Sequence, residues 1–250
     1  MDAMIIQVIG QAGAGKTALS EILADHINAI HINADKVRVG LNKDLGFELK
    51  DRIENARRLG ELARLLNNQI VIVDFICPTL ETRQAFGKPD ILIWVNRITK
   101  GRFEDSNKMW QDPTDVDLEI KIGLTVEEEV QLVIKQFNLP DWKAPTTLML
   151  GRYQPWHEGH EALKEKAYER TDQVVIGVRH TQGTSEKDPL SYEEVANRIR
   201  TETRSPFVVK MPNITNIVYG RDVGYKIEQI DLGAEVHAIS ATQKRKELGI

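Results

Sequence analysis

The sequence predicts an α/β protein built from two doubly wound parallel-sheet domains, the second smaller than the first. Three observations support this prediction. Short apolar runs such as "IVIVDFI", residues 70–76, alternate with longer stretches in which apolar residues recur at helical spacing. The alternation stops at residues 138–147, "NLPDWKAPTT", where two prolines and little periodicity indicate a linker. It then starts again, so we expect domains at residues 1–140 and 146–250.

The first domain is expected to alternate strands with helices. Short apolar runs of this kind are typical of strands that a parallel sheet buries on both faces. The expected strands are 4–9, 29–32, 70–76 and 91–96, and the expected helices are 16–28, 50–68 and 126–136. Residues 97–123 break the rhythm with a polar, irregular composition, which fits either a mobile lid over an active site or a plain surface loop.

The second domain repeats the alternation over a shorter length. The expected strands are 147–150, 173–178, 207–211 and 214–219, and the expected helices are 158–170, 191–202 and a short final helix from Thr242. This order again favours a parallel sheet joined by helical crossovers.

The composition excludes several classes of protein. The chain has 250 residues, 41% of them hydrophobic and 28% charged, an ordinary mixture for a soluble globular protein. A net charge of −4 disfavours nucleic acid as a partner, and the single cysteine, Cys77, allows no intrachain disulfide. No apolar run approaches ~20 residues and the start lacks the features of a signal peptide, so we expect a cytoplasmic protein with no membrane partner. A homo-oligomer is compatible with the sequence.

The turn after the first strand, "GQAGAGKT" at residues 10–17, fits the phosphate-binding pattern GxxxxGK[ST] between a strand and a helix. We expect backbone N–H groups of this loop to surround the β-phosphate of ATP, helped by the positive end of the following helix. The loop residues with this role are Gly10, Gly13, Ala14 and Gly15. Lys16 is expected to reach the β- and γ-phosphates as a catalytic residue, and Thr17 to hold Mg²⁺ through its hydroxyl.

Two carboxylates follow strands of the first domain. Asp35 comes after the second strand and Asp74 ends the third, at the edge of a parallel sheet where α/β active sites form. A carboxylate near the γ-phosphate can orient an acceptor hydroxyl, which is the catalytic role expected for Asp35. Asp74 stands in an apolar strand, where an unpaired charge is costly, and is expected to bind Mg²⁺ through water.

Residues 32–66, "INADKVRVGLNKDLGFELKDRIENARRLGELARLL", and 71–78, "VIVDFICP", resemble the adenylylsulfate kinase family. The resemblance covers roughly the first third of the chain and implies a P-loop kinase fold. Asp35 matches the second aspartate of the family's Asp-Gly-Asp motif, and Asn33 replaces the first. The resemblance implies that five further residues hold a nucleotide acceptor, the last two around its adenine: Arg38, Arg52, Asn55, Phe75 and Ile76.

Two features depart from that family. Cys77 stands where its Phe-Ile-Ser-Pro motif has serine, and "TKGRFEDSNKMWQDP", residues 99–113, replaces its glycine-rich lid. Lys100, Arg102 and Lys108 are the cations of this segment that we expect near phosphates. The departures leave the acceptor open, as any small nucleotide or metabolite with a hydroxyl. Taken without the resemblance, the arginines of helix 50–68 fit a solvated surface better than a binding site.

The second domain opens with "GRYQPWHEGH", residues 151–160, which places His157 and His160 three apart at the expected start of a helix. Zinc is disfavoured because no third ligand lies nearby in the sequence. Together with "ISATQKR", residues 239–245, this stretch resembles the HxGH nucleotidyltransferases of the cytidylyltransferase-like superfamily, particularly the nicotinamide-mononucleotide adenylyltransferases. The resemblance implies a Rossmann-like fold.

In a nucleotidyl transfer, a substrate phosphate attacks the α-phosphorus of a nucleoside triphosphate and expels pyrophosphate, so the protein supplies position and charge. We expect His157 and His160 to donate hydrogen bonds to the phosphates, and Gly159 to allow close backbone approach. The other expected nucleotide-binding residues are Gly151, Arg152, Arg221, Ser240, Thr242 and Arg245. Mg²⁺ is expected with the triphosphate, ATP is the expected nucleotide and CTP the alternative. Trp156 fits stacking on a substrate ring or simple packing equally well.

The sequence thus predicts a bifunctional transferase. One domain phosphorylates a hydroxyl with ATP, and the other transfers a nucleotidyl group, expected to be adenylyl, to the phosphate of a small metabolite. Since a kinase makes the phosphomonoester that a nucleotidyltransferase consumes, the first domain could feed the second. The alternatives are an adenylylsulfate kinase fused to an unrelated nucleotidyltransferase or cytidylyltransferase, and a non-catalytic nucleotide-binding protein.

Overall fold

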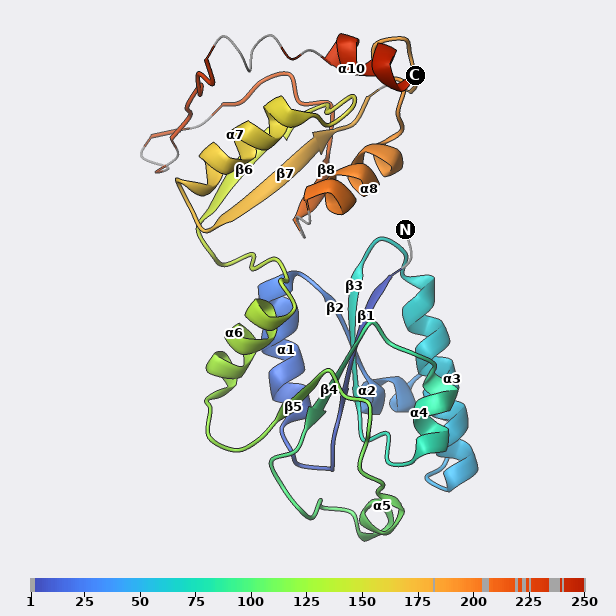
Figure 1. Cartoon of the computed structure of the whole chain (residues 1–250). Coiled ribbons are helices and arrows are strands. Elements are labelled where there is room, and N and C mark those ends of the chain that lie inside the picture. Colours follow the sequence, from blue (N-terminus) through green and yellow to red (C-terminus); the bar gives the residue numbers. More distant parts are fainter. Residues whose placement is uncertain are drawn as a thin grey trace. The chain divides into compact units, whose positions relative to one another are not determined.

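The computed structural model describes residues 3–181, 183–203, 207–218, 220–221, 224, 226–233, 239 and 241–249. The chain forms two compact units, Met1–Trp142 and Lys143–Ile250 (Figure 1). No helix within the described ranges is long and apolar enough to cross a lipid bilayer.

The first unit contains one five-stranded parallel sheet in the order β2-β3-β1-β4-β5. Its strands are β1 (Met4–Ile9), β2 (Ile30–Asn33), β3 (Ile70–Phe75), β4 (Ile91–Val95) and β5 (Leu118–Ile120). Its helices are α1 (Lys16–Ile27), α2 (Ala34–Val39), α3 (Leu49–Leu65), α4 (Leu80–Phe86), α5 (Glu104–Met109) and α6 (Val126–Gln136). The chain reverses the direction in which it adds strands after β3, and this switch point opens a crevice at the carboxyl ends of β1 and β3.

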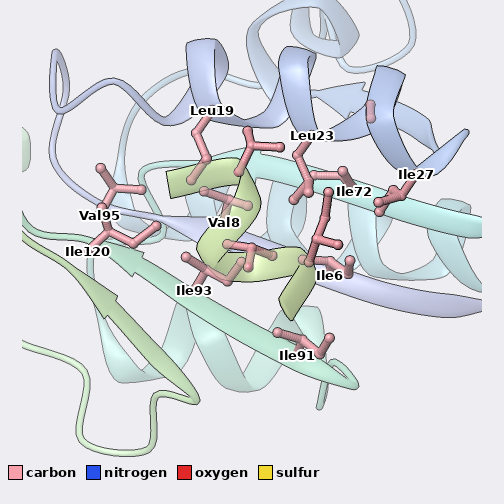
Figure 2. Close-up of a cluster of buried hydrophobic side chains, with 14 of the residues drawn as sticks. Ile6, Val8, Leu19, Leu23, Ile27, Ile72, Ile91, Ile93, Val95 and Ile120 are labelled. Atoms are coloured by element: carbon pink, nitrogen blue, oxygen red, sulfur yellow. The ribbon is translucent and has the colours of Figure 1, made fainter. Parts of the chain in front are cut away.

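Helices cover both faces of this sheet, as the sequence predicts (Figure 1). Alternate residues of β1 point to opposite sides because side chains alternate along a strand. Ile6 and Val8 join a core with α1 and α6, and Figure 2 shows Leu19 and Leu23 of α1 directed at these strands. Ile5 joins a second core, made with α2, α3 and α4. A doubly wound α/β sheet is therefore present in the first unit.

The segment 97–123 differs from a plain surface loop. It contains the short helix α5 and the edge strand β5, which pairs with β4. Neither was predicted, because α5 has the sequence "EDSNKM" without apolar periodicity and β5 has only three residues. The short helices α2 and α4 escaped prediction for the same reason.

The second unit contains a three-stranded parallel sheet in the order β6-β7-β8. Its strands are β6 (Thr146–Gly151), β7 (Gln173–Arg179) and β8 (Val208–Met211), and its helices are α7 (Glu158–Tyr168), α8 (Tyr192–Thr203) and α10 (Ala241–Leu248). The final helix thus begins one residue before the predicted start.

Two predictions for this unit are not met in the described residues: a doubly wound sheet with helices on both faces, and a strand at 214–219. Both α7 and α8 contribute to one core, together with Met149 and Ile176, so both lie on the same face of the sheet. Sequential strand order explains this arrangement, since successive right-handed crossovers place their helices on one side. The strand predicted at 214–219 is also wrong, because residues 214–218 form no strand. Tyr219 lies outside the described residues.

Candidate functional site

The loop between β1 and α1 has the backbone conformation that a phosphate cradle requires. Gly13 and Gly15 adopt left-handed φ values of 93° and 94°. A Cβ on Gly10 would lie 2.4 Å from the carbonyl oxygen of Val95, so no larger residue fits there. The N-terminus of α1 follows directly, and its free N–H groups face the loop, which favours an anion.

Lys16 is folded back on this loop. Its side chain is buried, and its Nζ donates a hydrogen bond to the carbonyl oxygen of Gln11 at 3.0 Å. Burial lowers the pKa of Lys16, although the charges of Asp74 and Asp35 act in the opposite direction. The carboxylates of Asp74 and Asp35 act on Lys16 only from a distance. A bound phosphate would give the buried ammonium group a direct ion pair.

The end of β3 and the start of α1 bring Thr17 and Asp74 together. The hydroxyl of Thr17 donates to Oδ2 of Asp74 at 2.6 Å, while Asn33 Nδ2 donates to both oxygens of this carboxylate at 3.0 and 3.2 Å. His31 Nε2 lies 2.7 Å from Oδ1. Burial opposes ionisation of Asp74, but the hydrogen bonds from His31 and Thr17 outweigh it and lower the pKa of this group.

This oxygen pair suits Mg²⁺, a hard cation that binds one or two protein oxygens and completes its shell with phosphates and water. Among the described residues, no group of three or more histidine, cysteine or acidic side chains could hold a metal by itself. Thr17 and Asp74 would therefore supply the protein's share of a magnesium site that is complete only with a polyphosphate. His31, which the sequence analysis missed, orients that carboxylate from the same strand face as Asn33.

One cavity of about 630 Å³ joins the phosphate loop to the predicted acceptor residues. All the residues assigned to the acceptor from the sequence line it, and Asp35 stands on its rim in the first turn of α2. These residues are Arg38, Arg52, Asn55, Phe75 and Ile76. Gly13, Gly15, Lys16 and Thr17 of the phosphate loop line the same cavity, whereas Gly10 and Ala14 are not among its lining residues.

The two arginines predicted to bind the acceptor lie close together. Arg38 donates to the carbonyl oxygen of Gly46 at 2.8 Å, and both guanidinium groups approach the ring of Phe47, at 4.9 and 5.7 Å from its centroid. Burial and the neighbouring charge of Arg52 lower the pKa of Arg38. Arg52 pairs with Asp105, and Arg38 donates to backbone carbonyl oxygens, so two crowded cations remain near each other and favour an acceptor that carries an oxyanion. Arg57 and Arg58 instead pair with acidic side chains on the surface.

Residues of the segment 97–123 differ in how they contribute to the cavity. Arg102 lines it, and its Nε would lie 3.0 Å from a Cβ placed on Gly13, directly against the phosphate loop. Lys108 is exposed and pairs with Glu104 at 3.2 Å, away from the site. Phe103, Asp105 and Ser106 also line the cavity, and the sequence analysis singled out none of them.

In the second unit, the predicted histidines form the start of α7. His157 is the N-cap, its Nδ1 accepts the N–H of Gly159 at 3.2 Å, and Nδ1 of His160 accepts the N–H of His157 at 3.3 Å. The two imidazole rings are stacked with centroids 3.8 Å apart. Because both Nδ1 atoms accept hydrogen bonds, each neutral ring carries its proton on Nε2. Each Nε2–H is therefore a donor suited to a phosphate oxygen.

Burial favours the neutral form of both imidazoles. It lowers the pKa of His157, and together with the charge of His157 it lowers the pKa of His160 to about 3. The rings of Tyr153 and Trp156 lie 5.0 and 5.3 Å from that of His160 and supply the apolar surroundings. Trp156 is itself buried in the core and its Nε1 donates to Glu161, so its role is packing.

The helix α10 contacts the histidine loop. Arg245 donates to the carbonyl oxygen of Gln154 at 2.9 Å and to the hydroxyl of Thr242 at 3.1 Å. Lys244, which the sequence analysis did not select, pairs with Glu158 at 3.0 Å. Two cations of α10 thus lie beside the start of α7, where a polyphosphate would meet both.

The remaining predicted residues of the second unit are placed less fully. Gly151 ends β6, and Arg152 pairs with Asp188 at 3.2 Å. Arg221 is exposed, while Ser240 lies outside the described residues. Their nucleotide-binding roles stay predictions.

A small cavity of about 140 Å³ lies at the end of β7 and was not anticipated. Gln154, Arg179 and Tyr192 are among its lining residues, and Nε of Arg179 is buried without a hydrogen-bond partner in the structure. The sequence could have pointed to Arg179, because it stands at the carboxyl end of a predicted parallel strand and ligands bind at that edge of a sheet.

The sheet order, the loop after β1 and the Thr17–Asp74 pair define the first unit as a P-loop nucleotide-binding domain. Residues 2–89 match the family model described as adenylylsulphate kinase. An adenylyl-sulfate kinase of Bacillus licheniformis is 44% identical over 86 residues, which are 32% of this chain and 44% of that protein. An adenylyl-sulfate kinase of Bacillus pumilus is 31% identical over 162 residues, which are 52% of this chain and 82% of that protein.

Through this first unit, the chain belongs to the adenylyl-sulfate kinase family. Among solved structures, the Mycobacterium tuberculosis APS kinase CysC in complex with AMPPNP and APS has 23% identity and a TM-score of 0.48, and the match covers 55% of this chain and 98% of that one. The chain spans less than half the length of several curated relatives that it matches.

Proposed function

We propose that the first unit transfers the γ-phosphoryl group of ATP to a hydroxyl of a small anionic nucleotide, with adenylylsulfate as the first acceptor to test. The observation that supports this most is the single cavity in which Lys16, the Thr17–Asp74 pair and Asp35 face Arg38 and Arg52. The phosphate-handling groups and the cations for an acceptor thus line the same cavity. Membership of the adenylyl-sulfate kinase family supports the same acceptor class.

Each residue has a separate task in this reaction. The backbone N–H groups of the loop and Lys16 hold the β- and γ-phosphates in place. Mg²⁺, held by Thr17 and Asp74, would neutralise charge on these phosphates. Asp35 accepts a hydrogen bond from the acceptor hydroxyl and aligns its oxygen with the γ-phosphorus, and Arg38 fixes the acceptor's oxyanion.

The test is ADP release by the full chain given ATP, Mg²⁺ and adenylylsulfate, with identification of the phosphorylated product. Asp35→Asn keeps the shape of the side chain and removes its charge, so ADP release is expected to fall at least tenfold. Lys36→Gln, on the exposed side of α2, is the matched control and should leave the rate unchanged. No ADP with adenylylsulfate or any other hydroxylated nucleotide would refute the proposed kinase.

We further propose that the second unit transfers a nucleotidyl group to a phosphate. The supporting observation is the stacked pair His157 and His160, whose Nε2–H donors stand at a helix start beside Arg245 and Lys244. Neutral donors and nearby cations suit a polyphosphate whose charge grows as pyrophosphate leaves. The resemblance of "GRYQPWHEGH" to the nucleotidyltransferases points to the same chemistry.

Pyrophosphate release tests this second activity. The full chain is given ATP or, in a parallel arm, CTP, with nicotinamide mononucleotide and other phosphomonoesters as acceptors. His160→Ala is expected to abolish pyrophosphate release and to leave ADP release by the first unit intact. Lys166→Gln, whose exposed side chain on the same helix pairs with Glu169, serves as a control outside the histidine loop. If ADP forms but no pyrophosphate is released with any nucleotide and acceptor, the proposed nucleotidyl transfer is refuted and only the kinase activity remains.

A further inference from the structure

The segment that leads into α5 is hydrogen-bonded both to α5 and to the phosphate loop. Asn107 accepts the N–H of Gly101 at 2.8 Å and donates to its carbonyl oxygen at 2.9 Å. The N–H of Arg102 donates to the carbonyl oxygen of Ala12, in the loop, at 3.1 Å. These bonds hold the start of α5 at the mouth of the cavity, so the side chains that follow form part of its wall.

Asp105 of α5 forms an ion pair with Arg52, one of the two arginines predicted to bind the acceptor. Its Oδ2 receives a hydrogen bond from the guanidinium of Arg52 at 2.5 Å. The side chain of Arg52 is 8% exposed and is also fixed by the carbonyl oxygen of Phe47 at 2.7 Å, whereas that of Asp105 is 54% exposed. Arg52 is therefore the fixed partner of the pair. The carboxylate of Asp105 can leave Arg52 and be hydrated by water at little cost in free energy.

Ser106, the next residue, carries a hydroxyl group that makes no hydrogen bond in the structure. Its side chain is 3% exposed, it lines the same cavity, and its hydroxyl is buried without a hydrogen-bond partner in the structure. A buried hydroxyl without a partner is costly, and native proteins rarely keep one unless a ligand or water completes it. The same cavity is lined by Arg38 and Arg52, the arginines predicted to bind the acceptor.

Resting on the kinase proposed above, we propose that Asp105 and Ser106 determine the specificity of the acceptor site. The carboxylate of Asp105 stands on Arg52 in the place of the acceptor's oxyanion, so a binding acceptor must displace it. The hydroxyl of Ser106 then donates to the acceptor. An acceptor without an oxyanion leaves Asp105 in place and binds poorly, which selects phosphate or sulfate esters over neutral hydroxyl compounds.

The experiment compares KM for adenylylsulfate in the full chain and in Asp105→Asn, which keeps the size of the side chain and removes its charge. Because the competing anion is gone, KM for the acceptor is expected to fall about threefold to tenfold, while KM for ATP stays the same. Glu104→Gln removes the same charge from the same helix outside the cavity, and no change is expected. An unchanged or raised acceptor KM in Asp105→Asn, or an equal fall in Glu104→Gln, would overturn the proposal.

Ser106→Ala supplies the second arm. Since the hydroxyl has no partner before the acceptor binds, the thermal unfolding midpoint is expected not to fall, whereas KM for adenylylsulfate is expected to rise about fivefold. A lower midpoint with unchanged KM would show a structural role and contradict the assignment. These outcomes all require turnover by the wild-type chain, so a failure of the kinase itself is recognised by the absence of ADP and is distinct from a failure of this inference.

Discussion

The buried imidazole of His160 gives the second unit a stability that depends on pH. Its pKa is lowered from 6.5 to about 3, chiefly by burial and secondly by the charge of the stacked His157. Between these values the unfolded chain binds a proton that the folded unit does not. The contribution of His160 is therefore complete above pH 6.5, and the free energy of unfolding falls as pH drops from 6.5 toward 3.

The size of this effect follows from the two pKa values. Each pKa unit corresponds to about 1.4 kcal/mol, so lowering the pH from about 7 to about 5 is expected to cost the second unit about 2 kcal/mol. His160→Gln, which has no titrating ring, should remove most of this dependence. Urea unfolding at the two pH values, in the wild type and the variant, measures the difference.

Nuclear magnetic resonance gives the pKa directly, with the His160 ring signals assigned by comparison with the same variant. The signals are expected to stay in the neutral form down to about pH 4, and the pH at which they titrate is expected to rise when a triphosphate binds, because nearby anions raise the pKa of an imidazole. A pKa near 6.5 in the free protein would refute the burial argument, and with it the assignment of neutral Nε2–H donors.

Further predictions concern the first unit. Lys16→Met should reduce ADP release by about 100-fold or more while pyrophosphate release continues, as coupled assays for the two products will show. Asp74→Asn should raise the Mg²⁺ concentration needed for half-maximal ADP release, and an unchanged requirement would remove this carboxylate from the magnesium site. Gly60→Ala should destabilise the unit by about 1–3 kcal/mol in urea, because its Cβ would lie 2.1 Å from the carbonyl oxygen of Phe86, whereas Gly40→Ala, with 4.0 Å to its nearest neighbour, should change stability by less than about 0.5 kcal/mol.

The phosphate loop could be predicted from the sequence because its information is local. Glycines at fixed positions, a lysine and a threonine between an apolar run and a helix specify both the turn and its ligand. The long helices were also predictable, since α3 and α6 repeat their apolar residues at helical spacing. The strand expected at 214–219 shows the limit of this reasoning, because residues 214–218 form no strand despite their apolar side chains.

The parts of the site that the sequence did not reveal depend on contacts between distant residues. Arg52 and Asp105 are far apart in the chain and meet only because the lid is attached to the phosphate loop. His31 reaches Asp74 through the pairing of β2 with β3, which no single segment encodes. Ser106 looks like any polar residue of a loop until its burial is known.

The measurement that tests the account most directly is calorimetric titration of the full chain with a non-hydrolysable ATP analogue and Mg²⁺. Two binding events are expected, of which Lys16→Met removes one and His160→Ala the other. One binding event in the wild type, or the loss of both through either substitution, would contradict the presence of two separate polyphosphate sites in this chain.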